Sequence, residues 1–166
     1  TECSFYHADE QDLPHWQEDG VSFKLIAGNY GERVSPVPVL SPLYLLEIKA
    51  TSKQTIKIGD ELYGEAGLYI LEGSVGVESE QFGPKQLLVA TNSKLCEFTM
   101  EAHTTVYIFG GEPLPEERLI YWNFVATDHE HIEHAKEKWK AQAFDPVPGE
   151  TEFVPLPPEP TNLKSK

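Results

Sequence analysis

Three carboxylates that lie close together in the sequence are the first candidates for chemistry. Asp60, Glu61 and Glu65 fall in one short stretch between two apolar segments. Carboxylate oxygens are the ligands that hard cations such as Ca²⁺ and Mg²⁺ prefer, so a cation site is one interpretation. Charged side chains in a loop are far more often hydrated than metal-bound. We therefore expect these three carboxylates to be solvated.

A histidine-rich run is the second candidate. The sequence His-Glu-His-Ile-Glu-His contains His129, His131 and His134. Neighbours on a helix surface lie three or four residues apart, so His131 with His134, or Glu130 with His134, could hold a transition metal. The alternative, which we prefer, is that the run is the exposed N-terminal face of a helix.

A group of tyrosines forms the third candidate. Tyr44, Tyr63 and Tyr69 fall in or beside segments with the alternating pattern of β-strands. If their side chains point inward, they line the mouth of a barrel, and with Glu47 or Glu72 they form a small polar and aromatic pocket. These five residues are the predicted pocket lining. No catalytic residue is predicted, because the sequence contains no phosphate-binding loop, nucleophile elbow or cysteine-pair metal motif.

The composition limits the classes of partner. The chain has 166 residues and a formal net charge of -14. Nucleic acids and anionic membranes bind clustered Lys and Arg, so the charge argues against both. The only cysteines are Cys3 and Cys96, too few for a disulfide framework, which favours a reducing compartment such as the cytoplasm.

Short alternating segments dominate the middle of the chain. Turn signals separate them at intervals of about 8–12 residues, which indicates an all-β sandwich or barrel. The expected strands are residues 21–28, 43–50, 55–58, 87–90, 95–100 and 104–109, and residues 67–77 are expected to form two strands joined by a glycine turn. Pro36, Pro38 and Pro42 lie between the first two expected strands. They exclude a helix and a central strand there, because each proline removes a backbone hydrogen-bond donor.

A single helix is predicted from Asp128 to Ala143. Thr127 or Asp128 can cap its start. The spacing of Ile132, Ala135 and Trp139 gives the helix one apolar face, which we expect to pack onto the outside of the sheet near Trp122 and Phe124.

Four segments follow from these patterns. Residues 1–20 are a polar N-terminal linker or strap, residues 21–126 the β-sandwich, and residues 127–145 the helix with its boundaries. Residues 146–166 are rich in proline and are predicted to be an extended tail.

A longer pattern near the C-terminus carries a family resemblance. Gly110-Gly111-Glu112-Pro113-Leu114 is a turn, Ile120-Tyr121-Trp122-Asn123-Phe124-Val125 an aromatic strand, and Pro148 to Pro157 the start of the tail. This order resembles the C-terminal half of pirin-family proteins, which are built from two cupin domains. The resemblance extends from Leu13 to Pro157 and implies a cupin-like jelly roll with one C-terminal α-helix.

The resemblance also implies where metal ligands would lie. The stretch from Gly59 to Gly73 is similar to the first cupin signature, which carries two histidines and a glutamate in metal-binding members. Here Ala66 stands at the glutamate position, and the histidine positions fall among Gly59, Asp60, Glu61 and Leu62. The second signature, from Gly83 to Asn92, also lacks its histidine. We therefore expect no metal cofactor in this chain.

The resemblance implies a second, N-terminal half, which we expect to be absent from this chain. In the family, the N-terminal cupin binds iron or a related metal, and several members look like quercetin 2,3-dioxygenases, whereas others act as regulatory partners. We expect this chain to be a non-catalytic cupin half that supports a metal-binding half. Two alternatives remain: it closes the pocket of a quercetin 2,3-dioxygenase-like parent enzyme, or it is a free-standing module for a small ligand. A homodimer is a further alternative, and the resemblance implies a cytoplasmic protein. The first residue is Thr1, which favours a trimmed chain.

Overall fold

The structure is a computed structural model that describes residues 5–58, 62–90 and 97–158. It divides into two compact units, Thr1–Pro113 and Leu114–Lys166. The sequence analysis instead placed a boundary after residue 126. The strands β12 (Leu119–Tyr121) and β13 (Phe124–Ala126) lie before residue 126 or end there, but they pack with α1 (His129–Lys140) and therefore belong to the second unit.

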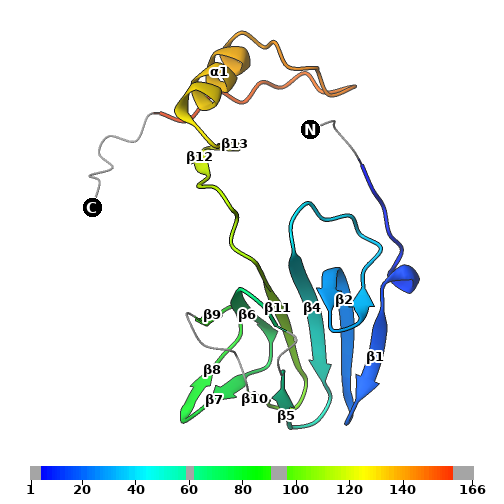
Figure 1. The fold of residues 1–166 in the computed structure, drawn as a ribbon. Helices are drawn as coiled ribbons and strands as arrows, with labels where there is room; N and C mark the ends of the chain where they lie inside the picture. The colour runs from blue at the N-terminus through cyan, green and yellow to red at the C-terminus, as the bar shows by residue number, and fades with distance from the viewer. Residues whose placement is uncertain (1–4, 59–61, 91–96, 159–166) are drawn as a thin grey trace. The chain divides into compact units, whose positions relative to one another are not determined.

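The first unit consists of strands and one short 3-10 helix (Figure 1). Its elements are η1 (Glu10–Asp12), β1 (His15–Glu18), β2 (Val21–Tyr30), β3 (Arg33–Val34), β4 (Leu43–Ala50), β5 (Gln54–Lys57), β6 (Glu65–Glu72), β7 (Val75–Val77), β8 (Glu80–Phe82), β9 (Leu87–Ala90), β10 (Glu97–Met100) and β11 (Thr104–Gly111). Among the described residues, the larger sheet has the order β1-β2-β4-β11-β6-β9 with β3 beside β2, and the smaller has the order β5-β10-β7-β8. The all-β prediction is confirmed.

The apolar core lies between the two sheets. In β4 the side chains of Tyr44, Leu46 and Ile48 are buried, and they alternate with the residues of the opposite face. Phe98 and Met100 of β10 belong to the same core cluster, although β10 belongs to the smaller sheet. Residues two apart on a strand share one face, so this alternation fixes which side chains can form a site on the outer face.

The N-terminal segment is part of the larger sheet. Residues 1–20 were predicted to be a linker or strap, but His15–Glu18 pairs with β2 as strand β1. Trp16 stacks on Phe23 at a centroid distance of 5.1 Å and on Tyr30 at 5.9 Å. The sequence analysis did not predict this strand because its residues are polar apart from Trp16. One aromatic side chain on the core face is enough to hold a short edge strand in the sheet.

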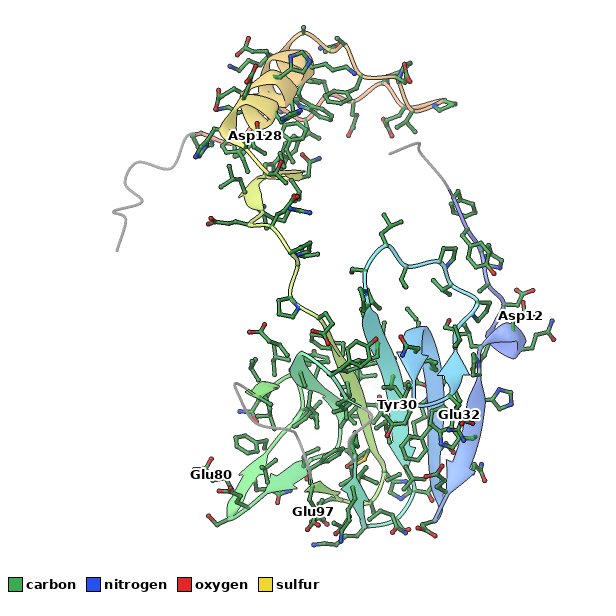
Figure 2. All side chains as sticks on the ribbon, viewed as in Figure 1. Asp12, Tyr30, Glu32, Glu80, Glu97 and Asp128 are labelled. Carbon is green, nitrogen blue, oxygen red and sulfur yellow. The ribbon has the colours of Figure 1, made fainter. Side chains whose placement is uncertain are left out.

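The second unit is a small hairpin and the one α-helix of the described residues. It contains β12 (Leu119–Tyr121), β13 (Phe124–Ala126) and α1 (His129–Lys140), and its last described residues, to 158, have no regular structure. Asp128 lies at the start of the helix (Figure 2). It caps the helix, since its Oδ1 accepts a hydrogen bond of 2.9 Å from the backbone N–H of His131. The predicted helix is confirmed, with Lys140 as its last residue.

An aromatic cluster holds this unit together. The Trp139 ring lies 5.1 Å from Trp122 and 6.2 Å from Phe124, as the apolar face of the helix predicted. The tail also packs on it, because Phe153 stacks on Trp139 at 5.8 Å and the Trp139 Nε1–H donates to the carbonyl of Val154 at 2.8 Å. No helix of the described residues is long and apolar enough to cross a membrane.

Candidate functional site

A row of polar side chains crosses the outer face of the larger sheet. Lys24 of β2 lies opposite Glu47 of β4 in the strand register. Glu47 lies opposite Tyr107 of β11, and Tyr107 lies opposite Tyr69 of β6. Because all four alternate with core residues, strand pairing alone brings side chains that are distant in sequence onto one surface.

Glu47 is the centre of this row. One carboxylate oxygen, Oε1, lies 2.8 Å from Lys49 Nζ and 3.2 Å from Lys24 Nζ. The other, Oε2, accepts a hydrogen bond of 2.9 Å from the Tyr107 hydroxyl. The Glu47 side chain is only 11% exposed, so these three donors replace the water that a surface carboxylate would have.

The electrostatics keep Glu47 ionised. Burial alone raises the pKa of Glu47, but hydrogen bonds from Lys49, Tyr107 and Lys24 outweigh burial, and the pKa lies below its ordinary value. The pKa of Tyr107 is raised, first by its hydrogen bond to Glu47 and then by burial. The pKa of Lys24 is also raised, mainly by a hydrogen bond to Glu10. Glu47 and Lys24 are therefore both charged at neutral pH.

A groove lies at one end of the row. It has a volume of about 920 Å³ and lies between the segment of η1 and β1 and the outer face of β2 and β4. Lys24, Glu47 and Lys49 line it from the sheet, and Glu10 and His15 line it from the N-terminal segment. Sequence analysis had singled out Glu47 alone of these residues.

The predicted pocket lining is divided between the two faces of the sheet. Tyr44 lies in the core, where its hydroxyl donates to the carbonyl of Glu65 at 3.3 Å. Its ring meets Tyr63 edge-on at 5.1 Å, and the Tyr63 hydroxyl donates to Asn29 Oδ1 at 2.9 Å and to the carbonyl of Leu43 at 2.8 Å. Burial raises the pKa of Tyr44 to about 12, and burial also raises that of Tyr63.

The backbone closes tightly around Tyr44. A Cβ atom placed on Gly110 would lie 1.9 Å from the carbonyl oxygen of Glu65 and 2.4 Å from the Tyr44 hydroxyl oxygen. Only glycine permits this approach. Tyr44 and Tyr63 are thus packed together as part of the core.

The other predicted lining residues face outward. Tyr69 is half-buried beside Tyr107, and Glu72 is exposed opposite Thr105 near the bulge between β6 and β11. The structure therefore groups Glu47 with Tyr69 through Tyr107, groups Tyr44 with Tyr63, and leaves Glu72 apart. The alternation of side chains along each strand could have shown that Tyr44 and Glu47 lie on opposite faces. Assigning Tyr107, Lys24 and Lys49 to the site required the strand register, which the sequence does not give.

Two of the family's metal-ligand positions, Leu62 and Ala66, lie in the described part of the chain. Ala66 and Leu62 are buried in the core, and neither side chain has a donor atom. Gly59, Asp60 and Glu61 lie outside the described residues. Within residues 5–58, 62–90 and 97–158, no three His, Cys, Asp or Glu side chains are grouped to hold a metal ion.

The histidine-rich run lies at the exposed start of α1. His129 and His134 are exposed, and His131 Nδ1 lies 2.7 Å from Asp128 Oδ2. The hydrogen bond to Asp128 raises the pKa of His131 above its ordinary value. His131 therefore belongs to the helix cap.

An apolar patch occupies the outer face beyond the polar row. Four side chains of β6, β9 and β11 form this apolar patch: Leu71, Leu87, Val89 and Phe109. Their exposed fractions are 41%, 51%, 61% and 39%. The ring of Phe109 lies over Gly67, where a Cβ atom would come within 3.0 Å of Phe109 Cε2. These apolar side chains are therefore partly exposed among the described residues.

Two antiparallel sheets that enclose one core define the class of protein as a jelly-roll sandwich of the cupin type. Residues 45–145 match the family model described as "Pirin C-terminal cupin domain". The chain belongs to this family, as the resemblance indicated.

Relatives and solved structures agree with this assignment. The chain is 34% identical over 153 residues to the Pirin-like protein of Caulobacter vibrioides, covering 92% of this chain and 52% of that protein. A crystal structure of Quercetin 2,3-dioxygenase from Acinetobacter baumannii matches with a TM-score of 0.78 and 28% identity, over 92% of this chain and 52% of that one. A second crystal structure of that title has a TM-score of 0.68 and 24% identity, over 82% and 49% of the two chains, and shows the shared fold. The chain spans about half the length of the curated relatives it matches.

Proposed function

We propose that this chain is the metal-free half of a two-cupin protein and that its apolar patch docks on a metal-binding half. The exposure of Leu71, Leu87, Val89 and Phe109 on one sheet face supports this role most directly. Contiguous apolar surface of this kind marks an interaction site in a monomer, because its burial removes it from water.

The identity of the partner follows from the family. The curated relative contains about as much chain again as the part that matches here. A second cupin half is the partner whose presence in the same polypeptide gives a high effective concentration without a large affinity. This supports an intramolecular partner over an unrelated protein.

The division of labour follows from the side chains. Ala66 and Leu62 supply no metal ligand, so any metal chemistry of a two-cupin parent belongs to its other half. The solved relative carries the name Quercetin 2,3-dioxygenase. In a parent with that activity, this half would cover the face of the metal-binding half on which it docks. Glu47 and Lys24 would stay charged and would not transfer protons.

Hydrogen exchange tests the proposal. The chain alone is compared with the chain in the presence of the metal-binding half of its parent, and we expect slower amide exchange in β6, β9 and β11. Val89→Asp should abolish this protection because it places a charge in the patch. Leu40→Asp is the matched control, since Leu40 is 92% exposed and lies outside the patch.

Three outcomes would contradict the proposal. The first is a parent that encodes no second cupin half, and the second is protection that appears only outside the patch. The third is self-association of the chain alone that Val89→Asp removes, which would make the patch a homodimer interface.

A further inference from the structure

The groove beside Glu47 has the dimensions of a ligand site. Its volume of about 920 Å³ falls within the range of ~300–1,000 Å³ that is typical of small-molecule sites. All of its lining residues belong to the first unit, to the N-terminal segment and to β2 and β4. It does not include the apolar patch.

Two lysines face the groove with donors to spare. Both ammonium groups contact the same oxygen of Glu47, Lys24 at 3.2 Å and Lys49 at 2.8 Å. An ammonium group has three N–H donors. The Lys49 side chain is 50% exposed and pairs with Glu47, so its ammonium group can donate to a further anionic group in the groove.

The chain already places a carboxylate in this position. Lys24 Nζ donates to Oε1 of Glu10, which reaches over from η1. The Glu10 side chain is 81% exposed, and η1 has no buried residue. A hydrated carboxylate on a three-residue 3-10 helix is weakly held, because exposed ion pairs contribute little to stability.

Two ammonium groups lose a carboxylate partner or have room for one when Glu10 leaves. Lys24 and Lys49 both contact Glu47, and only Lys24 also contacts Glu10. Asp9 also lines the groove, and its carboxylate lies 3.1 Å from His7 Nε2. His15 lines the groove as well.

We propose that this groove binds a small organic molecule through a carboxylate that replaces Glu10 at Lys24 and takes the open donors of Lys49. Gln17 and Ser22 also line the groove on the same face as Lys24, and the aliphatic parts of the lysine side chains contact the body of such a ligand. Glu10 then acts as a built-in competitor that keeps the site closed when the ligand is scarce. This site is independent of the proposed docking of the apolar patch.

Titration with benzoate tests the proposal, with uncharged benzamide as the matched probe. Backbone amide signals of the labelled chain are followed by NMR. We expect benzoate to shift the signals of Ser22, Lys24 and Lys49, which lie at the groove, and benzamide to leave them unchanged. The apparent Kd should rise with added salt, because exposed charges are screened.

Two substitutions of opposite sign sharpen the test. Lys49→Met should raise the Kd for benzoate roughly fivefold or more, and Glu10→Gln should lower it roughly two- to fivefold, because the competing charge is gone. Lys57→Met and Glu97→Gln are the controls. Lys57 and Glu97 form an ion pair of 3.5 Å on the smaller sheet, away from the groove, and the two substitutions remove the same kinds of charge. Both controls should leave the Kd unchanged.

The proposal is overturned if benzoate and benzamide produce the same shifts, or if benzoate shifts signals only outside the groove. It also fails if Glu10→Gln weakens binding, or if the Lys57 control changes the Kd as much as Lys49→Met does.

Discussion

The Tyr107 hydroxyl donates a hydrogen bond of 2.9 Å to Glu47 Oε2 across the pairing of β11 and β4. The two residues are 60 positions apart in sequence. Their contact depends on the register of two strands that are adjacent only in the folded sheet. It also leaves Oε1 of Glu47 for Lys24 and Lys49, so one tyrosine orients the carboxylate of the whole polar row.

The first prediction concerns this hydrogen bond. Tyr107→Phe removes one donor to the ionised carboxylate, and we expect the pKa of Glu47 to rise toward its ordinary value. The free energy of unfolding should fall by about 1 kcal/mol, below the range for a fully buried bond to a charged group because the site is partly hydrated. NMR titration of the Glu47 carboxyl carbon and chemical denaturation measure the two effects.

Tyr107→Phe should also change how much stability the fold loses in acid. A lowered pKa in the folded state contributes stability at pH values above the pKa of the unfolded chain, and this stability is lost as the pH falls through the folded value. Tyr107→Phe should therefore lose less stability than the native chain between neutral and acidic pH. A larger acid-induced loss in the variant would contradict the role of Tyr107.

The second prediction concerns Gly110. Gly110→Ala would place a Cβ atom within 1.9 Å of the Glu65 carbonyl oxygen, so backbone must move and the Tyr44 hydroxyl must shift. We expect a loss of more than about 3 kcal/mol in the free energy of unfolding, beyond the usual range for a point mutation. Gly83→Ala is the control, since its nearest neighbour would be 4.0 Å away. It should change the free energy of unfolding by less than about 0.5 kcal/mol.

The third prediction concerns the aromatic cluster of the second unit. Trp139→Ala removes the ring that Trp122, Phe124, Phe144 and Phe153 all contact. We expect the free energy of unfolding to fall by about 3 kcal/mol. This is the low end of the range for truncation of a tryptophan, because the Trp139 ring is half-buried. Near-ultraviolet circular dichroism during thermal unfolding reports on the cluster. An unchanged transition would show that the helix does not depend on this ring.

The fourth prediction concerns the cap of α1. The pKa of His131 is raised by its hydrogen bond to Asp128 and by the charge of that carboxylate. Asp128→Asn retains an acceptor for the backbone N–H but removes the charge, so the pKa of His131 should fall while the helix persists. A raised pKa stabilises the fold below the unfolded value, and this contribution disappears as the pH rises through the folded value.

Glu133→Gln provides the control for the cap, because Glu133 pairs with Lys136 and does not contact His131. NMR titration of the His131 ring should distinguish the two variants. Equal pKa values of His131 in Asp128→Asn and in the native chain would show that the cap does not set its protonation.

The strands and the helix were predictable because their signals are local. Alternation marked β2, β4 and β11, and the spacing of Ile132 and Trp139 marked the apolar face of α1. The family pattern near the C-terminus depended on the order of local elements in the same way. These signals do not require knowledge of which strands are neighbours.

The composition of the site was not predictable, because it depends on pairing. The alternation of β4 puts Tyr44 and Glu47 on opposite faces, which argues against one pocket lined by both. The contacts of Glu47 with Lys24 and Tyr107 required the sheet order, which no local pattern specifies. Strand β1 was missed for a similar reason, since only the stacking of Trp16 on Phe23 makes a polar segment part of the sheet.

The position of β1 at the end of the larger sheet has a consequence for how the chain can be shortened. A fragment that starts at Val21 would retain residues 45–145, the part that matches the family, but would lose the partner of β2 over Val21–Lys24. The freed backbone N–H and C=O groups belong to a ten-residue strand with buried Val21, Phe23 and Leu25. Such an edge is a template for intermolecular strand pairing, and the fragment would be prone to aggregate during expression.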